Sequence, residues 1–158
     1  MADSFTDAFA KLIGNEGGYT LDDGGATMYG ITEAVARANG YMGDMHNLTL
    51  KQAQSIAKTK YWDVFQCDQF DPRVGFQVFD AAYNGGHPAQ WLQQAVGIKA
   101  DGVIGAQTIA AVRSSDPLKV ILKFDAYRLQ YMASLLVWPT YGKGWANRIA
   151  NNMVAAAA

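Results

Sequence analysis

The sequence predicts a mainly α fold, packed as one compact domain, with a small β-hairpin near residues 19–31. Three observations lead to this prediction. Apolar residues recur at the spacing of one helix face in several segments, capping residues precede those segments, and a Gly- and Asp-rich stretch covers residues 16–31. With 158 residues, 50% of them hydrophobic, the chain is long enough to bury one core.

The first helix is predicted after Ser4, a good N-cap, and ends at Asn15, where Gly17 and Gly18 follow. Its apolar face is formed by Phe5, Ala8, Phe9, Leu12 and Ile13. After the loop or hairpin of residues 16–31, Thr32 is predicted to cap a short helix that reaches residue 39. Thr49 opens the next helix, which extends to about residue 61, with the capping-box pattern Thr-x-x-Gln.

Pro72 suits the first turn of a helix. The segment Val74–Tyr83 is apolar almost all round, which indicates a buried helix, although its first residues also alternate as in a strand. Short helices are predicted over residues 88–96 and 106–112. A long helix begins at Asp116 and runs to about residue 136, and a last one covers residues 144–153 after the break at residues 138–139.

Charge is distributed unevenly along the chain. The formal net charge is −1, which argues against nucleic-acid binding, but residues 1–80 carry −5 and residues 81–158 carry +4. The acidic half could host acid chemistry, and the basic half could meet an anionic surface; two differently solvated faces explain the same pattern. The cations of the predicted basic surface are Lys119, Lys123, Arg128, Lys143 and Arg148.

Several kinds of chemistry are not indicated. Cys67 is the only cysteine, so no internal disulfide is expected, and the two histidines, His46 and His87, have no partner at metal-ligand spacing. We therefore expect no metal and no cofactor. No apolar run reaches the ~18 residues of a membrane span and no secretory signal is visible, so we expect no stable membrane insertion and synthesis in a cytoplasm.

Glu16 is the first candidate for catalysis. It continues the apolar face of the first helix, four residues after Leu12 and three after Ile13, at the point where glycines end the helix. A poorly solvated carboxyl group has a raised pKa and can stay protonated near neutrality, as the general acid of glycosidic-bond cleavage requires. A frayed last turn that leaves Glu16 in water explains the same spacing.

The loop after Glu16 supplies candidates for the second group that a glycosidase usually needs. Such a loop can bring Asp22, Asp23 or Thr27 opposite Glu16. A carboxylate would stabilise the oxocarbenium-like transition state or orient water. The sequence leaves open whether Asp22, Asp23 or neither carboxylate acts in this way.

The motifs of the chain resemble those of glycoside hydrolase family 108, the N-acetylmuramidases found in phage endolysins and in some bacterial lysis or secretion proteins. The resemblance covers Phe5 to Arg148 in order. The matching motifs are Asn15-Glu-Gly-Gly-Tyr19, Gly24-Gly-Ala-Thr27, Gly30-Ile-Thr32, Lys60-Tyr-Trp62, Phe79-Asp-Ala-Ala-Tyr-Asn-Gly85 and Tyr141-Gly-Lys-Gly-Trp145. One departure is that the family's Asp-Pro-rich insertion between the Glu and Thr motifs is absent here.

The resemblance implies a lysozyme-like helical fold and hydrolysis of the β-1,4 bond between N-acetylmuramic acid and N-acetylglucosamine. Glu16 matches the family's catalytic glutamate and Thr27 matches the threonine of the second motif, where a hydroxyl could help place water. Asp80 lies alone on the predicted buried helix and is expected to be a structural acid. We expect four residues to be candidates for the glycan groove, although core packing explains the aromatic ones equally well: Tyr29, Trp62, Tyr83 and Asn84.

The C-terminal half resembles a peptidoglycan-binding module that commonly follows in this family. The matching segments are Trp91–Gly97, Asp101-Gly-Val-Ile-Gly105 and Thr108. Within the single compact domain of residues 1–158, we therefore expect residues 1–86 to be the catalytic part and residues 87–158 a peptidoglycan-binding-like helical part packed on it. A purely structural role for this second part explains the pattern equally well.

The biological setting that the resemblance implies is a phage endolysin whose partner is bacterial peptidoglycan. We expect a monomer that accumulates in the host cytoplasm and reaches the wall, in the periplasm, when a holin-type protein opens the membrane. Two other functions remain open. A lytic transglycosylase would cleave the same bond with one Glu and without water, and a non-catalytic protein would bind peptidoglycan and release nothing.

Overall fold

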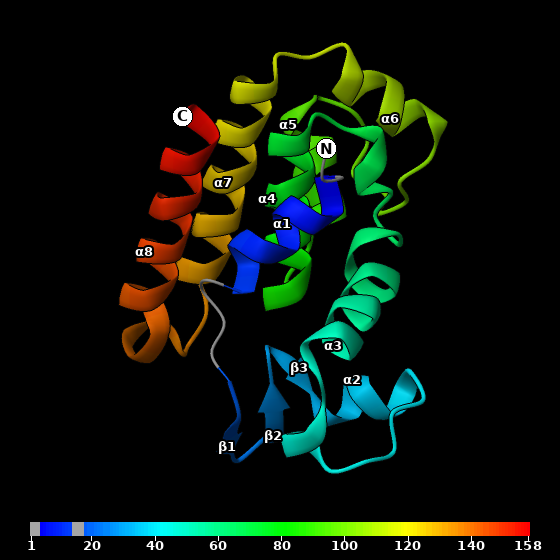
Figure 1. Ribbon diagram of the computed structural model, residues 1–158. Coiled ribbons are helices and arrows are strands. Elements are labelled where there is room, and N and C mark those ends of the chain that lie inside the picture. The colour runs from blue at the N-terminus through cyan, green and yellow to red at the C-terminus, as the bar shows by residue number, and fades with distance from the viewer. Residues whose placement is uncertain (1–3, 14–17) are drawn as a thin grey trace. The chain divides into compact units, whose positions relative to one another are not determined.

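The computed structural model describes residues 4–13 and 18–158, which form two compact units, Met1–Val64 and Phe65–Ala158 (Figure 1). This division lies inside the part expected to be catalytic, and the functional division expected at residue 86 stays a prediction. In unit 1 the elements are α1 (Ser4–Ile13), β1 (Thr20–Asp22), β2 (Gly25–Met28), β3 (Ile31–Thr32), α2 (Glu33–Ala38), the 3-10 turn η1 (Met45–Asn47), α3 (Leu50–Ala57) and the π-helical turn η2 (Lys58–Trp62). In unit 2 they are the 3-10 turn η3 (Cys67–Gln69), α4 (Pro72–Asn84), α5 (Pro88–Ala95), α6 (Ala106–Arg113), α7 (Pro117–Ala133) and α8 (Trp138–Ala157).

The helix α1 buries the face that its sequence pattern predicts. Phe5, Phe9 and Leu12 are each at most 4% exposed. The ring of Phe5 packs edge-on against Trp62, with the ring centroids 5.5 Å apart. The described part of this helix therefore belongs to the core, and it leads directly into the segment that carries Glu16.

The predicted hairpin is part of a three-stranded antiparallel sheet in the order β1-β2-β3. Asp22 fixes the first turn, because its Oδ1 accepts a hydrogen bond of 2.8 Å from the backbone N–H of Gly24. In the second turn both central residues have positive φ, 51° at Tyr29 and 76° at Gly30. This is the backbone pattern of a two-residue type I′ turn, which suits the twist of paired strands.

The helix α3 begins as its capping box predicts. Thr49 accepts a hydrogen bond from the backbone N–H of Gln52, and the Gln52 side chain accepts one from the backbone N–H of Thr49. The helix then changes into the π turn, where the N–H of Asp63 reaches the carbonyl of Lys58, five residues back. This turn ends at Trp62, which has no exposed surface.

Unit 2 is a group of packed helices around α4. The helix α4 is buried along most of its length, so its helical rather than strand character is confirmed. The helix α7 packs against α4, α5 and α8, and α7 and α8 lie side by side in Figure 1. The sequence pattern predicted a break in helical structure at residues 138–139, and this prediction is wrong. Pro139 lies in the first turn of α8, where a proline is tolerated. In the described part of the chain, no helix is long and apolar enough to cross a membrane.

Candidate active site

The predicted acid, Glu16, lies outside the described residues, so its role stays a prediction. The segment that follows it is held by an aromatic stack. Tyr19 lies on the ring of His46, with the centroids 3.6 Å apart and the planes 19° from parallel. His46 is in turn bonded to Asp44 through its backbone N–H (2.8 Å) and its Nδ1 (3.0 Å), and these bonds lower the pKa of Asp44. From the sequence, His46 was weighed only as a metal ligand, so its stacking on Tyr19 was not predicted.

Thr27 lies on the middle strand of the sheet and is half-buried. Its partners across the sheet are Thr20 on β1 and Thr32 on β3, so the three side chains lie on the same face. Thr32 uses its hydroxyl to cap α2, accepting from the N–H of Val35 at 3.2 Å. The sheet thus presents a row of three threonine side chains on one face.

The two candidate carboxylates occupy different positions in the first turn. Asp22 serves the turn through its bond to Gly24, whereas Asp23 is exposed at the tip. Nearby, the half-buried Tyr29 holds a left-handed backbone conformation that costs a non-glycine residue about 1 kcal/mol or more. The type I′ turn between β2 and β3 accounts for this conformation, and a role of the Tyr29 ring in glycan binding stays a prediction.

Two of the four candidates for the glycan groove lie in the core. Trp62 is 0% exposed, and a ring without exposed surface has no face to offer a sugar. Tyr83 is 9% exposed and packs edge-on against Phe79, at 5.7 Å between ring centroids. Core packing, the alternative that the sequence left open, therefore accounts for both aromatic residues.

Asn84 is exposed at the C-terminal end of α4 and lines a cavity of about 200 Å³. The other lining residues are Gly85, Gly86, Tyr131, Met132, Leu135 and Trp145. Gly86 has φ of +117°, and a Cβ there would lie 2.5 Å from the Trp91 indole, so only glycine fits. Tyr131 on α7 and Leu135 just after its end could not be predicted as lining residues, because the sequence of this region does not show which side meets α4.

A buried ion cluster lies one helical turn before Asn84. The Asp80 carboxylate accepts hydrogen bonds from Arg128 (2.8 Å), Arg148 (2.8 Å) and Asn152 (2.8 Å). Burial alone would raise the pKa of Asp80, but the bonds and charges of the two guanidinium groups outweigh it and hold that pKa below the ordinary 3.8. The prediction that Asp80 is a structural acid is confirmed.

Asp125, one turn before Arg128 on α7, is the second carboxylate of this cluster. It is 1% exposed, and neither carboxylate oxygen has a hydrogen-bond partner among the described residues. Burial raises the pKa of Asp125 to about 7; the Arg128 charge opposes this rise and the Asp80 charge adds to it. With a pKa of about 7, Asp125 is protonated in a large part of the molecules near neutrality, although it is far from the catalytic motifs in sequence.

The predicted basic surface is wrong for two of its five members. Arg128 is 0% exposed, and the Arg148 side chain is only 13% exposed because it is paired with Asp80. Both arginines neutralise a buried carboxylate and contribute nothing to an outer patch. The cations that remain at the surface of α7 and α8 are Lys119, Lys123 and Lys143.

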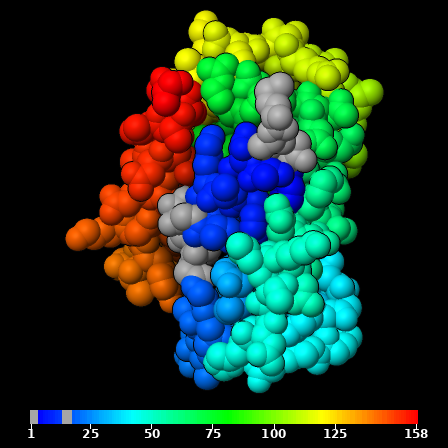
Figure 2. All heavy atoms as spheres, in the orientation of Figure 1, coloured from blue at the N-terminus to red at the C-terminus, as the bar shows by residue number. Residues whose placement is uncertain are grey.

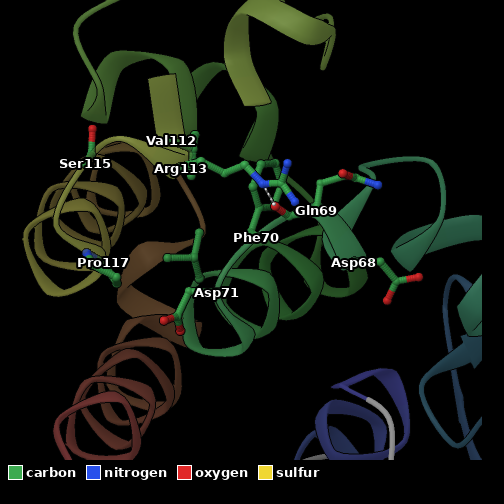
Figure 3. A pocket seen from close by; sticks show the side chains of 9 residues that line it. Asp68, Gln69, Phe70, Asp71, Val112, Arg113, Ser115 and Pro117 are labelled. Carbon is green, nitrogen blue, oxygen red and sulfur yellow. Dashed lines mark hydrogen bonds between the residues drawn. The ribbon is translucent and has the colours of Figure 1, made fainter. Parts of the chain in front are cut away.

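A larger cavity, of about 370 Å³, lies elsewhere in unit 2 (Figure 3). Three of its polar side chains already stabilise the fold. Asp71 caps α4 and pairs with Arg73, Arg113 donates its Nε–H to the carbonyl of Gln69 at 2.9 Å, and Ser115 donates to a backbone carbonyl. The cavity is lined by Asp68, Gln69, Phe70, Asp71, Val74, Val112, Arg113, Ser115 and Pro117. We assign no ligand to it.

The motif predicted to bind peptidoglycan organises a loop. The buried Gln93 amide donates to Asp101 (2.9 Å), to the carbonyl of Val103 (3.0 Å) and to Thr108 (3.1 Å), and its oxygen accepts from the N–H of Gly102 (2.9 Å). The motif's main polar groups are thus bonded to one another. This supports the structural role that the sequence left open, while peptidoglycan binding by residues 87–158 stays a prediction.

Comparisons with known proteins agree with this architecture. A family model described as glycosyl hydrolase 108 matches residues 9–86. A solved structure of SagA from Brucella abortus is 33% identical, with a TM-score of 0.88 over 97% of this chain and 93% of the SagA chain. No curated protein matches the chain.

These matches place the molecule among the glycoside hydrolases, and the predicted mainly α, lysozyme-like fold with a small β-sheet is confirmed. The chain belongs to glycosyl hydrolase family 108.

Proposed function

We propose that this protein is a peptidoglycan hydrolase that cleaves the β-1,4 bond between N-acetylmuramic acid and N-acetylglucosamine. The observation that carries the proposal is membership of glycosyl hydrolase family 108, whose match spans both Glu16 and Thr27. The half-buried Thr27 on the middle strand of the sheet supports it, because its hydroxyl is held on a regular element. A glycosidase usually needs a general acid and a second group that positions or activates water.

In the proposed reaction, Glu16 donates its proton to the oxygen that leaves with one sugar. A water molecule adds to the anomeric carbon of the other sugar, and its proton passes to a second group. Thr27 helps to place that water. Asp23 is the better candidate for the second carboxylate, because Asp22 is engaged with Gly24 in the turn, whereas Asp23 is exposed.

Tyr29 and Asn84 are the candidates for contact with the glycan that keep accessible surface. Tyr29 offers a half-buried ring in a strained turn, and Asn84 offers an exposed amide. Aromatic faces and neutral amides are the groups that glycan sites use for stacking and for hydrogen bonds to hydroxyl and acetamido groups. Trp62 and Tyr83 support the fold instead.

The biological role that we propose is that of a phage endolysin. The protein would act as a monomer, be made in the host cytoplasm, and reach peptidoglycan in the periplasm after a holin-type protein has opened the membrane. The family is also found in bacterial lysis and secretion, so lysis of cells that express the protein with and without a holin tests this setting. Lysis that needs no membrane-opening partner would contradict it.

The test of the reaction is mass analysis of the fragments released from purified peptidoglycan. The wild type is compared with Glu16→Gln, which keeps the shape of the side chain and removes the transferable proton. We expect the rate to fall by ~10²–10⁴. The matched control is Glu33→Gln at the only other glutamate, which makes an exposed i, i+4 pair with Arg37 that is worth little; it should act like the wild type.

The masses also separate the other functions. Hydrolysis leaves reducing ends, whereas a lytic transglycosylase leaves an anhydro sugar that is lighter by one water. A protein that sediments with peptidoglycan and releases nothing would be a binding protein. A Glu16→Gln variant that keeps more than about half of the activity with unchanged folding would remove Glu16 from the role of acid.

A further inference from the structure

The cavity at the end of α4 has a definite architectural origin. The helices α4 and α8 run antiparallel and are joined by polar contacts in a regular order. Gln77 donates to the carbonyl of Asn152 at 3.1 Å, and Asp80 binds Arg148 at 2.8 Å. One turn further along each helix, Asn84 and Trp145 line the same cavity. The ion cluster therefore fixes Trp145 beside Asn84.

An aromatic group continues from this cavity along the start of α8. Tyr141 and Trp145 are one turn apart, and their rings are stacked at 5.6 Å between centroids, 26° from parallel. Tyr141 is 54% exposed, and Trp138 lies 6.2 Å from Trp145. Gly142 is buried beneath Trp138, where a Cβ would overlap the indole. The Tyr141–Trp145 motif thus builds an aromatic platform of one exposed and two half-buried rings with Trp138. Figure 2 shows α8, in orange to red, at the surface of unit 2.

The lining of the cavity selects for a neutral ligand. Its seven residues include no charged side chain; they supply one exposed amide, two aromatic side chains and apolar or glycine surface. A peptide with free carboxylates would find no cation in this lining. At about 200 Å³, the cavity is smaller than the ~300–1,000 Å³ of sites for drug-sized ligands, so it suits one ring rather than an extended chain.

We propose that this cavity is a glycan subsite that takes one N-acetylhexosamine ring of the substrate strand. The apolar face of the sugar packs on Trp145, because the C–H groups of a pyranose meet the negative face of an aromatic ring. The Asn84 amide hydrogen-bonds the polar edge of the sugar, and Tyr131 closes the cavity from α7. This inference rests on the proposed function and assigns the Tyr141–Trp145 motif a role in substrate binding.

The test measures binding of a soluble N-acetylglucosamine tetramer by calorimetry. The parent protein carries Glu16→Gln, so that the tetramer is not cleaved during the measurement. We expect Trp145→Ala to weaken binding by about tenfold or more, and Trp145→Phe, which keeps a ring, to recover most of it. Asn84→Ala should weaken binding by about three- to tenfold through the lost hydrogen bond.

Tyr127→Ala is the matched control, since Tyr127 is a half-buried α7 tyrosine that does not line the cavity; it should bind like the parent. Circular dichroism shows whether each variant is folded. If Trp145→Ala is unfolded, Asn84→Ala decides the question, because Asn84 is exposed and its replacement should not disturb folding. Parental affinity in folded Trp145→Ala and Asn84→Ala overturns the subsite, as does a parent that binds no tetramer.

Release of muropeptides by the otherwise wild-type enzyme reports separately on the proposed function. If the wild type releases fragments while the cavity variants bind like the parent, the function stands and the subsite is wrong. If the wild type releases nothing while Trp145→Ala still loses tetramer binding, the subsite stands as a glycan-binding site and the hydrolase function fails. In an active enzyme, Trp145→Ala should raise KM more than it lowers kcat.

Discussion

Replacing Asp125 by asparagine removes one ionisable group from the core of unit 2 and changes the size of the side chain little. The groups that face Asp125 are Asp80 on α4 and Arg128 on α7, and Arg148 on α8 completes the cluster through Asp80. Asp80 accepts hydrogen bonds from Arg128 Nη1 and from Arg148, whereas the Asp125 oxygens, like Arg128 Nε and Nη2, have no hydrogen-bond partner among the described residues. The ionised form of Asp125 is therefore the disfavoured one.

The pKa of Asp125 is raised from 3.8 to about 7, so the unfolded chain loses this proton at lower pH than the folded protein does. The contribution of Asp125 to stability consequently falls by about 1.4 kcal/mol per pH unit as pH rises from about 4 to about 7, which is ~4 kcal/mol in all. Above pH 7 this contribution no longer changes. Asparagine carries no proton to lose. Between pH 5 and pH 8, the free energy of unfolding of Asp125→Asn should rise by about 2–3 kcal/mol relative to the wild type.

Urea unfolding at pH 5, 6, 7 and 8 measures this difference for both proteins. The contributions of the other ionisable groups cancel because these groups are present in both proteins. Asp7→Asn, at an exposed position of α1, is the control and should show a difference from the wild type that does not change with pH. A constant difference for Asp125→Asn over the same range would refute the reasoning.

Three further substitutions test other parts of the structure. Thr27→Ala should impair wall lysis less than loss of the acid does, because a hydroxyl contributes a hydrogen bond and no proton; turbidity clearance measures it, and wild-type activity would reduce Thr27 to a packing residue. Gly86→Ala should lower the melting temperature by roughly 5–10 °C, because the backbone is strained and the new Cβ clashes with the Trp91 indole. Gly85→Ala should lower it less, because φ is +90° there but the space is open. Equal decreases in melting temperature would contradict the role of the clash. Gln93→Leu should destabilise unit 2 by about 2–4 kcal/mol, because it leaves several buried polar groups unpaired, whereas Gln94→Leu on the exposed face should change urea stability little; similar values would argue against the loop network.

The sequence predicts the helices well where local signals are strong. The capping box at Thr49 and the apolar stripe after Ser4 each depend on residues within one or two turns. The helix α3 begins as predicted, and α1 buries the predicted face, although Ser4 already belongs to the helix. The end of the long helix at Ala133 and the start of the last at Trp138 were missed. Those boundaries depend on packing between α7 and α8, which no local pattern contains.

Residues of the candidate site that belong to a sequence motif could be predicted, whereas residues that meet only through tertiary contacts could not. Thr27 came from a motif. The partners of Asp80 are 48 to 72 residues away in the chain, and His46 stacks on Tyr19 across an intervening helix and sheet. Trp62 shows the converse limit, because an aromatic residue in a family motif looks the same in sequence whether it meets a ligand or fills a core.

The π turn at Lys58–Trp62 has a consequence for the evolution and engineering of this region. A π turn holds one more residue than the α-helical turn that it replaces, so it shifts the angular phase of everything that follows by about 100°. Deleting one residue there would restore a regular α-helix and swing the Trp62 indole away from Phe5. We therefore expect this short stretch to tolerate substitution of the exposed Lys60 but to resist any change of length.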